Sequence, residues 1–154
     1  MVAGSLALTA TVVPAFLTGA LSGRIGDDLG FGAGAAGAAV AAFFIGAGVF
    51  AVPMGRLTER IGAAMALRAG VALSAACALV VASAAQRWWE LALGLLVAGS
   101  AVGLVDTGAA RAFGDAVPDG RQGVAFGAKE ASVPAASLVA GLSIPALVDV
   151  TGWR

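Results

Sequence analysis

The stretch LGFGAGAAGAAVAAFFIGAGVFAVPMG, residues 29–55, contains no charged side chain. A helix needs about 20 predominantly apolar residues to cross the hydrocarbon core of a bilayer, and this stretch is longer than that. Its many alanines and glycines would make a poor core in water, whereas in a membrane small residues let neighbouring helices approach closely. The stretch therefore predicts a membrane-spanning helix.

The composition of the whole chain agrees with this prediction. Of the 154 residues, 60% are hydrophobic and only 12% are charged, and the mean hydropathy is +0.96. A soluble domain carries roughly 25% charged residues, so the surface of this chain is suited to lipid rather than water. The formal net charge is zero, which gives no electrostatic argument for nucleic acid as a partner. We expect the lipid bilayer to be the main partner.

Clusters of charged residues divide the rest of the chain into further apolar runs. Tryptophan gathers at membrane–water boundaries, and Arg87-Trp88-Trp89-Glu90 has this character. Residues 114–123 indicate a loop, because Gly, Asp and Pro recur there. We therefore predict one all-α transmembrane domain over residues 1–154, with about five spanning helices at residues 2–22, 30–54, 65–86, 88–110 and 124–148.

The distribution of Lys and Arg predicts how the chain is oriented, because basic residues concentrate in cytoplasmic loops. A cytoplasmic N-terminus puts six of them in cytoplasmic loops, namely Arg56, Arg60, Arg68, Arg111, Arg121 and Lys129. It leaves three for the outer loops, namely Arg24, Arg87 and Arg154. We therefore expect the N-terminus in the cytoplasm, with Asp27 and Asp28 in a solvated outer loop.

One loop carries a family signature. Residues 55–68, GRLTERIGAAMALR, resemble the signature loop of the major facilitator superfamily, usually written G-x-L-a-D-R-x-G-r-k. Glu59 keeps the charge of the usual Asp, Ala63 and Ala64 replace the usual basic pair, and Arg68 supplies a positive charge one turn later. The resemblance implies a gating loop, and its motif residues are Gly55, Leu57, Glu59, Arg60, Gly62 and Arg68. Pro53, just before this loop, can kink the preceding helix, and more simply we expect it to end that helix.

The resemblance continues downstream. Residues 121–127 resemble the entry to the fifth helix of the family, Gly141 and Pro145 resemble its Gly/Pro-rich stretch, and residues 152–154 resemble the junction before the sixth helix. Residues 126–131, with Pro134, are similar to the cyanate-transporter-like branch. No arginine lies in the fourth predicted span, which departs from many members and weakens any proton-coupling role for that position.

This resemblance implies a partial N-terminal bundle that lacks the sixth helix, in a membrane of the bacterial plasma-membrane type. It implies secondary-active transport of an unknown small solute by alternating access, together with a C-terminal half or a second copy of the chain. A different hypothesis is a truncated remnant that transports nothing. Another is a small membrane scaffold that oligomerises through glycine pairs spaced by four, namely Gly19/Gly23, Gly30/Gly34, Gly99/Gly103 and Gly123/Gly127.

Three ionisable residues interrupt the apolar runs. Asp106, Lys129 and Glu130 are candidates for binding the substrate or a proton, because intramembrane charges are costly and usually functional. We expect Lys129 either to attract an anionic substrate or to pair with Asp106. The alternative for all of them is a shallow position at the interface. Adjacent helical positions point in different directions, so Lys129 and Glu130 are not expected to face the same way.

The chain offers little for other chemistry. It has no histidine, and its single cysteine, Cys77, lies in an apolar run and suits a packing role. No cluster with metal-ligand spacing and no P-loop is present in the sequence. We therefore predict no enzymatic activity, no metal site, no cofactor and no ATP-driven step.

Overall fold

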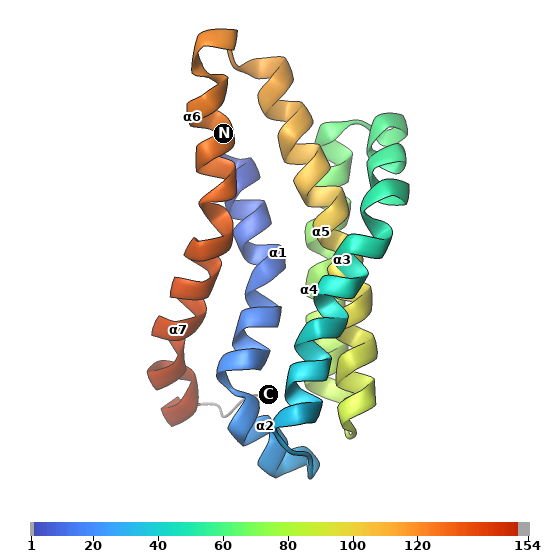
Figure 1. Cartoon of the computed structure of the whole chain (residues 1–154), viewed down its shortest axis with the longest axis vertical. Coiled ribbons are helices and arrows are strands. Elements are labelled where there is room, and N and C mark those ends of the chain that lie inside the picture. Colours follow the sequence, from blue (N-terminus) through green and yellow to red (C-terminus); the bar gives the residue numbers. More distant parts are fainter. Residues whose placement is uncertain (1, 151–154) are drawn as a thin grey trace.

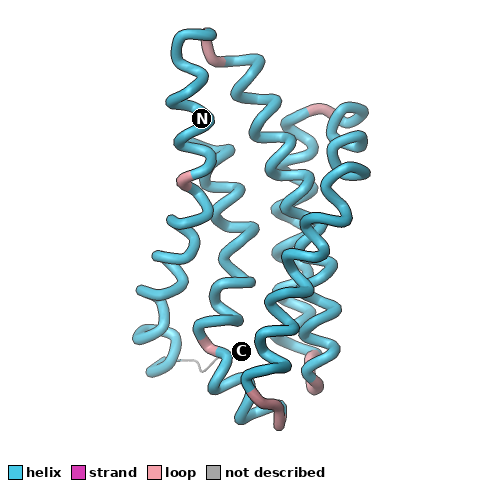
Figure 2. The backbone as a smooth tube through the Cα atoms, in the orientation of Figure 1, coloured by secondary structure: helices cyan, strands magenta, loops and turns pink. Residues whose placement is uncertain are grey.

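The computed structural model describes the backbone of residues 2–150, and the side chains in that range except those of residues 119 and 144–150. The described backbone consists of helices joined by short turns, without strands (Figure 2). In order, the helices are α1 (Val2–Ala20), α2 (Ser22–Leu29), α3 (Ala33–Ile61), α4 (Ala63–Ala84), α5 (Trp88–Ala116), the short 3-10 helix η1 (Asp119–Arg121), α6 (Gln122–Glu130) and α7 (Ser132–Val150).

Successive long helices run in opposite directions (Figure 1). The α3–α4 turn and the α5–α6 connection lie at the upper end of Figure 1, and α1 also begins toward that end. The short helix α2 and the α4–α5 turn lie at the lower end. Helix α4 lies behind α3 and α5 in this view, so the front face is formed by α7, α1, α5 and α3.

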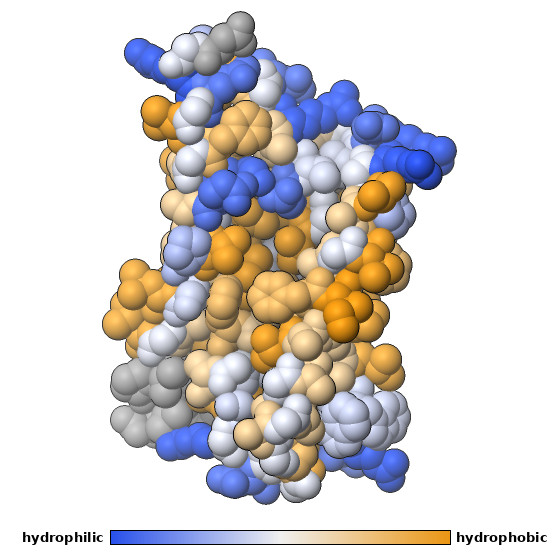
Figure 3. Space-filling model, viewed as in Figure 1, coloured by the Kyte–Doolittle hydropathy of each residue, from blue (hydrophilic) through white to orange (hydrophobic). Residues whose placement is uncertain are grey.

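Four of the described helices, α1, α3, α4 and α5, are long and apolar enough to cross a membrane. In the space-filling view, hydrophilic residues gather at both ends of the bundle and apolar residues dominate the middle (Figure 3). This arrangement suits a bilayer, since backbone polar groups are paired within helices and most charges lie at the two interfaces. The chain is an integral membrane protein.

The closest packing in the bundle joins α3 to α5. A Cβ added to Gly99 would lie 2.0 Å from the Phe43 carbonyl oxygen, and one added to Gly46 would lie 2.1 Å from the Leu96 carbonyl oxygen. The two backbones therefore touch, which only glycine permits at these positions. Of the glycine pairs noted in the sequence, Gly99/Gly103 is the one that forms such a seam inside the described bundle.

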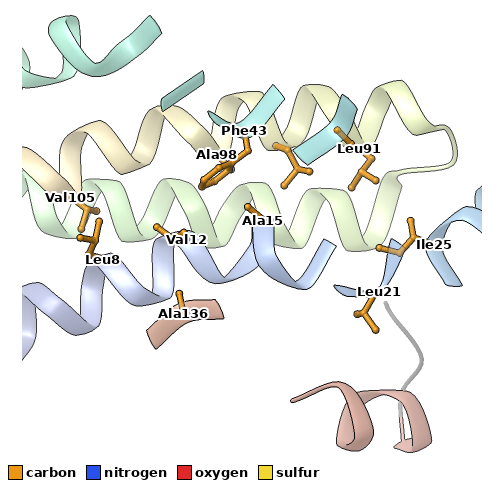
Figure 4. Close-up of a cluster of buried hydrophobic side chains, with 12 residues drawn as sticks. Leu8, Val12, Ala15, Leu21, Ile25, Phe43, Leu91, Ala98, Val105 and Ala136 are labelled. Carbon is orange, nitrogen blue, oxygen red and sulfur yellow. The ribbon is translucent and has the colours of Figure 1, made fainter. Parts of the chain in front are cut away.

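A second contact zone holds α1 against its neighbours. Buried side chains from α1, α3, α5 and α7 form one cluster around α1 (Figure 4). They include Leu8, Val12, Ala15, Phe43, Ala98, Val105 and Ala136. Because α1 lies between α5 and α7, it connects the tightly packed α3–α4–α5 group to the last helices of the chain.

Two boundary predictions are wrong. Helix α3 does not end near Pro53 but continues to Ile61, so the start of the signature stretch is helical rather than loop. Proline inside a transmembrane helix is tolerated because neighbouring groups compensate for the missing hydrogen bond. The reversal is completed at Gly62, whose φ of 81° lies in the left-handed region that favours glycine. Asp27 and Asp28 lie on helix α2, with exposed side chains, rather than in a loop.

The fifth predicted span corresponds to two helices, α6 and α7, separated by a turn at Ala131. Pro134 accounts for this break, because it has no N–H to donate to the Glu130 carbonyl four residues earlier. Whether α6 and α7 together cross the membrane stays a prediction.

Candidate functional site

The three ionisable candidates lie together. The Lys129 ammonium pairs with the Asp106 carboxylate, and its Nζ also lies 2.9 Å from Glu130 Oε1. The cluster thus joins the middle of α5 to the last turn of α6. Of the two roles expected for Lys129, the structure shows the pairing with Asp106. The structure also shows Lys129 and Glu130 in contact with each other. We did not expect this contact, because adjacent positions of a helix point in different directions.

Burial differs sharply within the cluster. The Lys129 side chain is 7% exposed, whereas those of Asp106 and Glu130 are 44% and 71% exposed. A buried ammonium is stable only when it is paired, so the two carboxylates compensate the charge of Lys129. The atoms that this site presents to its surroundings are therefore carboxylate oxygens.

Local structure explains how these side chains meet. Lys129 occupies the C-terminal turn of α6, where the helix dipole favours a cation. Two hydroxyls of α1 hold the α6–α7 junction in place: Ser5 donates to the Ala128 carbonyl at 3.4 Å, and Thr9 donates to the Ser132 carbonyl at 3.3 Å. The same junction contains the Glu130 carbonyl. In a regular helix the N–H of residue 134 would donate to this carbonyl, but Pro134 has no N–H.

The cluster lies away from the end of the bundle at which α6 begins. Lys129 follows the first residue of α6 by seven positions, which corresponds to about 10 Å along a helix. In Figure 3, a hydrophilic patch over α6 and α5 is bordered by apolar surface, below the hydrophilic upper end. The patch is on the front face, which α7, α1, α5 and α3 form.

The signature residues lie at the upper end of α3 and the start of α4. Leu57, Glu59 and Arg60 are exposed on the last turns of α3, and Gly62 forms the turn. Arg68 is exposed on the second turn of α4. Gly55 packs near Thr107 of α5, with 3.7 Å between an added Cβ and Thr107 Cγ2. None of these residues contacts the Asp106–Lys129–Glu130 cluster through a described ion pair.

Hydroxyl groups fasten this end of α3 to α5. Thr58 Oγ1 and Thr107 Oγ1 are 2.8 Å apart, and each hydroxyl also lies within hydrogen-bond distance of the carbonyl four residues before it in its own helix. Arg111 of α5 donates to the Glu59 carbonyl at 3.5 Å, which connects α5 to the signature stretch. Sequence reasoning missed both threonines, since a hydroxyl carries no charge to distinguish it in an apolar helix.

A cleft of about 520 Å³ opens beside these contacts. It lies between α3 and α5, and its lining residues are Gly55, Thr58, Glu59, Thr107, Ala110, Arg111 and Asp115. Arg111 Nε lies 3.9 Å from Asp115 Oδ2, one turn further along α5. Among the side chains that the structure describes, no three of His, Cys, Asp or Glu come close enough to hold a metal ion.

Comparison with known proteins identifies the family. Residues 2–154 match the family model described as Major Facilitator Superfamily. No match to a curated protein is found. The family match covers nearly the whole chain and agrees with the helical bundle and with the signature stretch between α3 and α4. Members of this family are transporters rather than enzymes. The chain belongs to the major facilitator superfamily.

Proposed function

We propose that the chain contributes to secondary-active transport of a small solute by alternating access, as part of a major facilitator type transporter. The observation that carries this proposal is the Asp106–Lys129–Glu130 cluster, which lies between α5 and α6 in a chain of this family. Ionisable groups inside a membrane domain are expensive and commonly mark the path of a solute or proton. The cluster is therefore the proposed binding site for the solute or the coupling proton.

The signature residues have a proposed gating role. Gly55, Leu57, Glu59, Arg60, Gly62 and Arg68 surround the α3–α4 turn. Thr58, Thr107 and Arg111 connect this end of α3 to α5. A movement of the turn would therefore be transmitted to α5, which also carries Asp106. This connection supports a mechanism in which the gate and the charged site respond to each other.

The front face of the bundle is the proposed side of the solute path. It is formed by α7, α1, α5 and α3, and it carries the hydrophilic patch over α6 and α5 (Figures 1 and 3). A second half or a second copy of the chain would face this surface, since transporters of this type place the solute between two related halves. The proposed location is a bacterial-type plasma membrane with a cytoplasmic N-terminus. The proposed relation to the cyanate-transporter-like branch is supported by residues 126–131 and Pro134.

Alternating access is tested with a single cysteine beside the cluster. Cys77→Ala removes the native thiol, and Gly127→Cys places a new one where an added Cβ meets nothing within 4 Å. Membrane-impermeant maleimide is applied from either side of sealed, oriented vesicles. We expect labelling from both sides, with the rate from one side rising as the rate from the other falls when a pH gradient is imposed.

The matched control for this experiment is Gly23→Cys, another open glycine, on α2 at the lower end of the bundle. It is expected to react from one side only, whatever the gradient. Labelling of Gly127→Cys from a single side under every gradient would show that the site does not alternate, and the proposed mechanism would then be wrong.

A further inference from the structure

We propose that a groove between α4 and α5 binds one zwitterionic glycerophospholipid whose headgroup carries a primary ammonium. One acyl chain fills the groove, and Arg87 and Glu90 at its mouth take the phosphate and the ammonium. This site is separate from the charged cluster between α5 and α6 and does not rest on the proposed function. The inference follows from the shape of the groove, from its length and from the charges at its mouth.

The α4–α5 groove has a volume of about 620 Å³, and Glu90 is the one charged residue among its described lining residues. Its base lies where the two helices touch, since a Cβ added to Gly94 would lie 2.3 Å from Val81 Cγ2. Val80 and Leu93 also line it and are 61% and 54% exposed. In a membrane this exposed apolar surface faces lipid, so an acyl chain is the occupant that the surroundings supply.

The length of the groove matches one leaflet of a bilayer. Along α4 the groove extends from Ala76 to Ala85, which is about 13 Å at the helical rise of about 1.5 Å per residue. Along α5 it extends from Trp89 to Val97, which is about 12 Å. Half of the hydrocarbon core is about 15 Å thick. One acyl chain can therefore lie in the groove from the interface nearly to the middle of the membrane.

Two tryptophans place the mouth of the groove at the membrane interface. Trp89 lines the groove, Trp88 precedes it, and both side chains are exposed. Tryptophan side chains gather at the level of the lipid headgroups. Helix α4 ends at Ala84 and α5 begins at Trp88, so the turn between them lies beyond the hydrocarbon core. A lipid with its chain in the groove therefore has its headgroup beside this turn.

The turn offers that headgroup one positive and one negative side chain. Arg87 is exposed and lies between the lining residues Ala85 and Trp89. Glu90 lines the groove, and its Oε2 accepts from the backbone N–H groups of Gln86 at 2.7 Å and Arg87 at 3.2 Å. These bonds hold the carboxylate at the mouth and leave Oε1 for a further donor. Arg87 and Glu90 do not pair with each other among the described ion pairs.

These two charges select the headgroup. A guanidinium matches the geometry of a phosphate, and an ammonium donates well to a carboxylate. A headgroup that carries both a phosphate and a primary ammonium therefore satisfies Arg87 and Glu90 together. An anionic headgroup without an ammonium satisfies Arg87 but is repelled by Glu90. The site should therefore prefer phosphatidylethanolamine over phosphatidylglycerol.

Native mass spectrometry of the purified, delipidated chain in detergent counts the lipids that bind when either phospholipid is added. We expect one phosphatidylethanolamine to bind per chain, at least about threefold more tightly than phosphatidylglycerol, which is the size of an exposed ion pair. Cys77 lines the groove, so bound phosphatidylethanolamine should also slow its reaction with N-ethylmaleimide. Equal or tighter binding of phosphatidylglycerol would overturn the inference, and so would a lipid-free dimer of the chain that protects Cys77.

Charge variants test the headgroup. Glu90→Gln keeps an oxygen acceptor for the backbone N–H groups and removes the charge, so the preference for phosphatidylethanolamine is expected to disappear. Arg87→Gln is expected to weaken the binding of both lipids by at least about threefold. Arg24→Gln is the matched control, because it removes another exposed arginine at the same end of the bundle, on α2. An unchanged preference in Glu90→Gln would refute the assigned headgroup.

A pair of phenylalanine variants tests the acyl chain. Ala76→Phe fills the inner end of the groove and is expected to weaken the binding of both lipids and to abolish the protection of Cys77. Ala75→Phe is the control, since Ala75 is exposed but does not line the groove. Equal binding by these two variants would refute the place of the chain. The wild-type lipid preference requires no variant, so it decides the question even if a variant fails to fold.

Discussion

At the scale of single residues, Lys129 is the position on which the site depends most, because its ammonium is buried and both of its partners are carboxylates. Lys129→Met leaves those carboxylates close together without a cation. We expect a loss of about 2 kcal/mol in the free energy of unfolding, below the value for a fully buried pair because the carboxylates are partly exposed. Thermal unfolding in detergent, followed by circular dichroism, measures this loss.

The double variant Lys129→Met/Asp106→Asn is the control for this prediction. The double variant removes the repulsion between the Asp106 and Glu130 carboxylates as well as the ion pair between Lys129 and Asp106. It is therefore expected to recover part of the lost stability. A double variant that is less stable than Lys129→Met would show that the carboxylates do not repel each other in the absence of Lys129.

The paired hydroxyls of Thr58 and Thr107 give a second prediction at this scale. Thr58→Val or Thr107→Val alone is expected to cost about 1 kcal/mol in the free energy of unfolding, since each leaves the other hydroxyl with fewer partners. The double variant is expected to cost less than the sum, because it removes both polar groups together. Chemical denaturation in mixed detergent measures the free energies of unfolding of the wild type, the two single variants and the double variant. If the losses of the two single variants add up to the loss of the double variant, the hydroxyls do not interact.

The charged residues of the site could be predicted from the sequence, whereas the threonines could not. Asp106, Lys129 and Glu130 stand out because charges are rare within apolar runs, so the sequence alone identifies all three as candidates. Their geometry was not available from spacing: the approach of Glu130 to Lys129 depends on flexible side chains at a helix end. Thr58 and Thr107 gave no signal, because hydroxyl side chains are common in transmembrane helices and are usually bonded to their own backbone.

At the scale of elements, the contact between α3 and α5 is the tightest in the described bundle. Gly99→Leu would drive a side chain into the backbone of Phe43, which lies 2.0 Å from an added Cβ. We expect a loss of at least about 3 kcal/mol in stability, or failure to fold, since backbone cannot move aside. Gly48→Leu, on α3 with nothing within 4 Å of an added Cβ, is the control and should change little.

Size-exclusion chromatography and thermal unfolding of the two glycine variants check this prediction. Equal stability of Gly99→Leu and Gly48→Leu would contradict the close approach of α3 and α5. The same two variants test the scaffold hypothesis at this seam. Because Gly99 and Gly103 already pack against α3 within one chain, replacing these glycines should lower the stability of the chain rather than change its oligomeric state.

The four long apolar helices were predictable from the sequence, and the helix ends were not. Apolar runs between charges identified the four long helices, because the length of a span is fixed by the bilayer. The end of α3 does not follow from the position of proline, because the helix continues through Pro53 to Ile61. The break between α6 and α7 has its physical cause in Pro134, which has no N–H to donate.

At the scale of the whole molecule, the two ends of the bundle should lie on opposite sides of the membrane. Asp115→Cys marks the upper end of Figure 1 and Gln86→Cys marks the lower end, both exposed, in a Cys77→Ala background. If the N-terminus is cytoplasmic, impermeant maleimide should label Gln86→Cys in intact spheroplasts and Asp115→Cys only after permeabilisation. The reverse pattern would invert the proposed orientation.

Solute uptake into proteoliposomes tests the central claim most directly. The purified chain is reconstituted, a proton gradient is imposed, and a mixture of small solutes is offered outside. Mass spectrometry then identifies what is retained. We predict that at least one solute accumulates with the wild-type chain, that Lys129→Met abolishes this accumulation, and that Asp27→Asn leaves it unchanged. Retention identical to that of empty liposomes for every solute, by correctly inserted chains, would contradict the account.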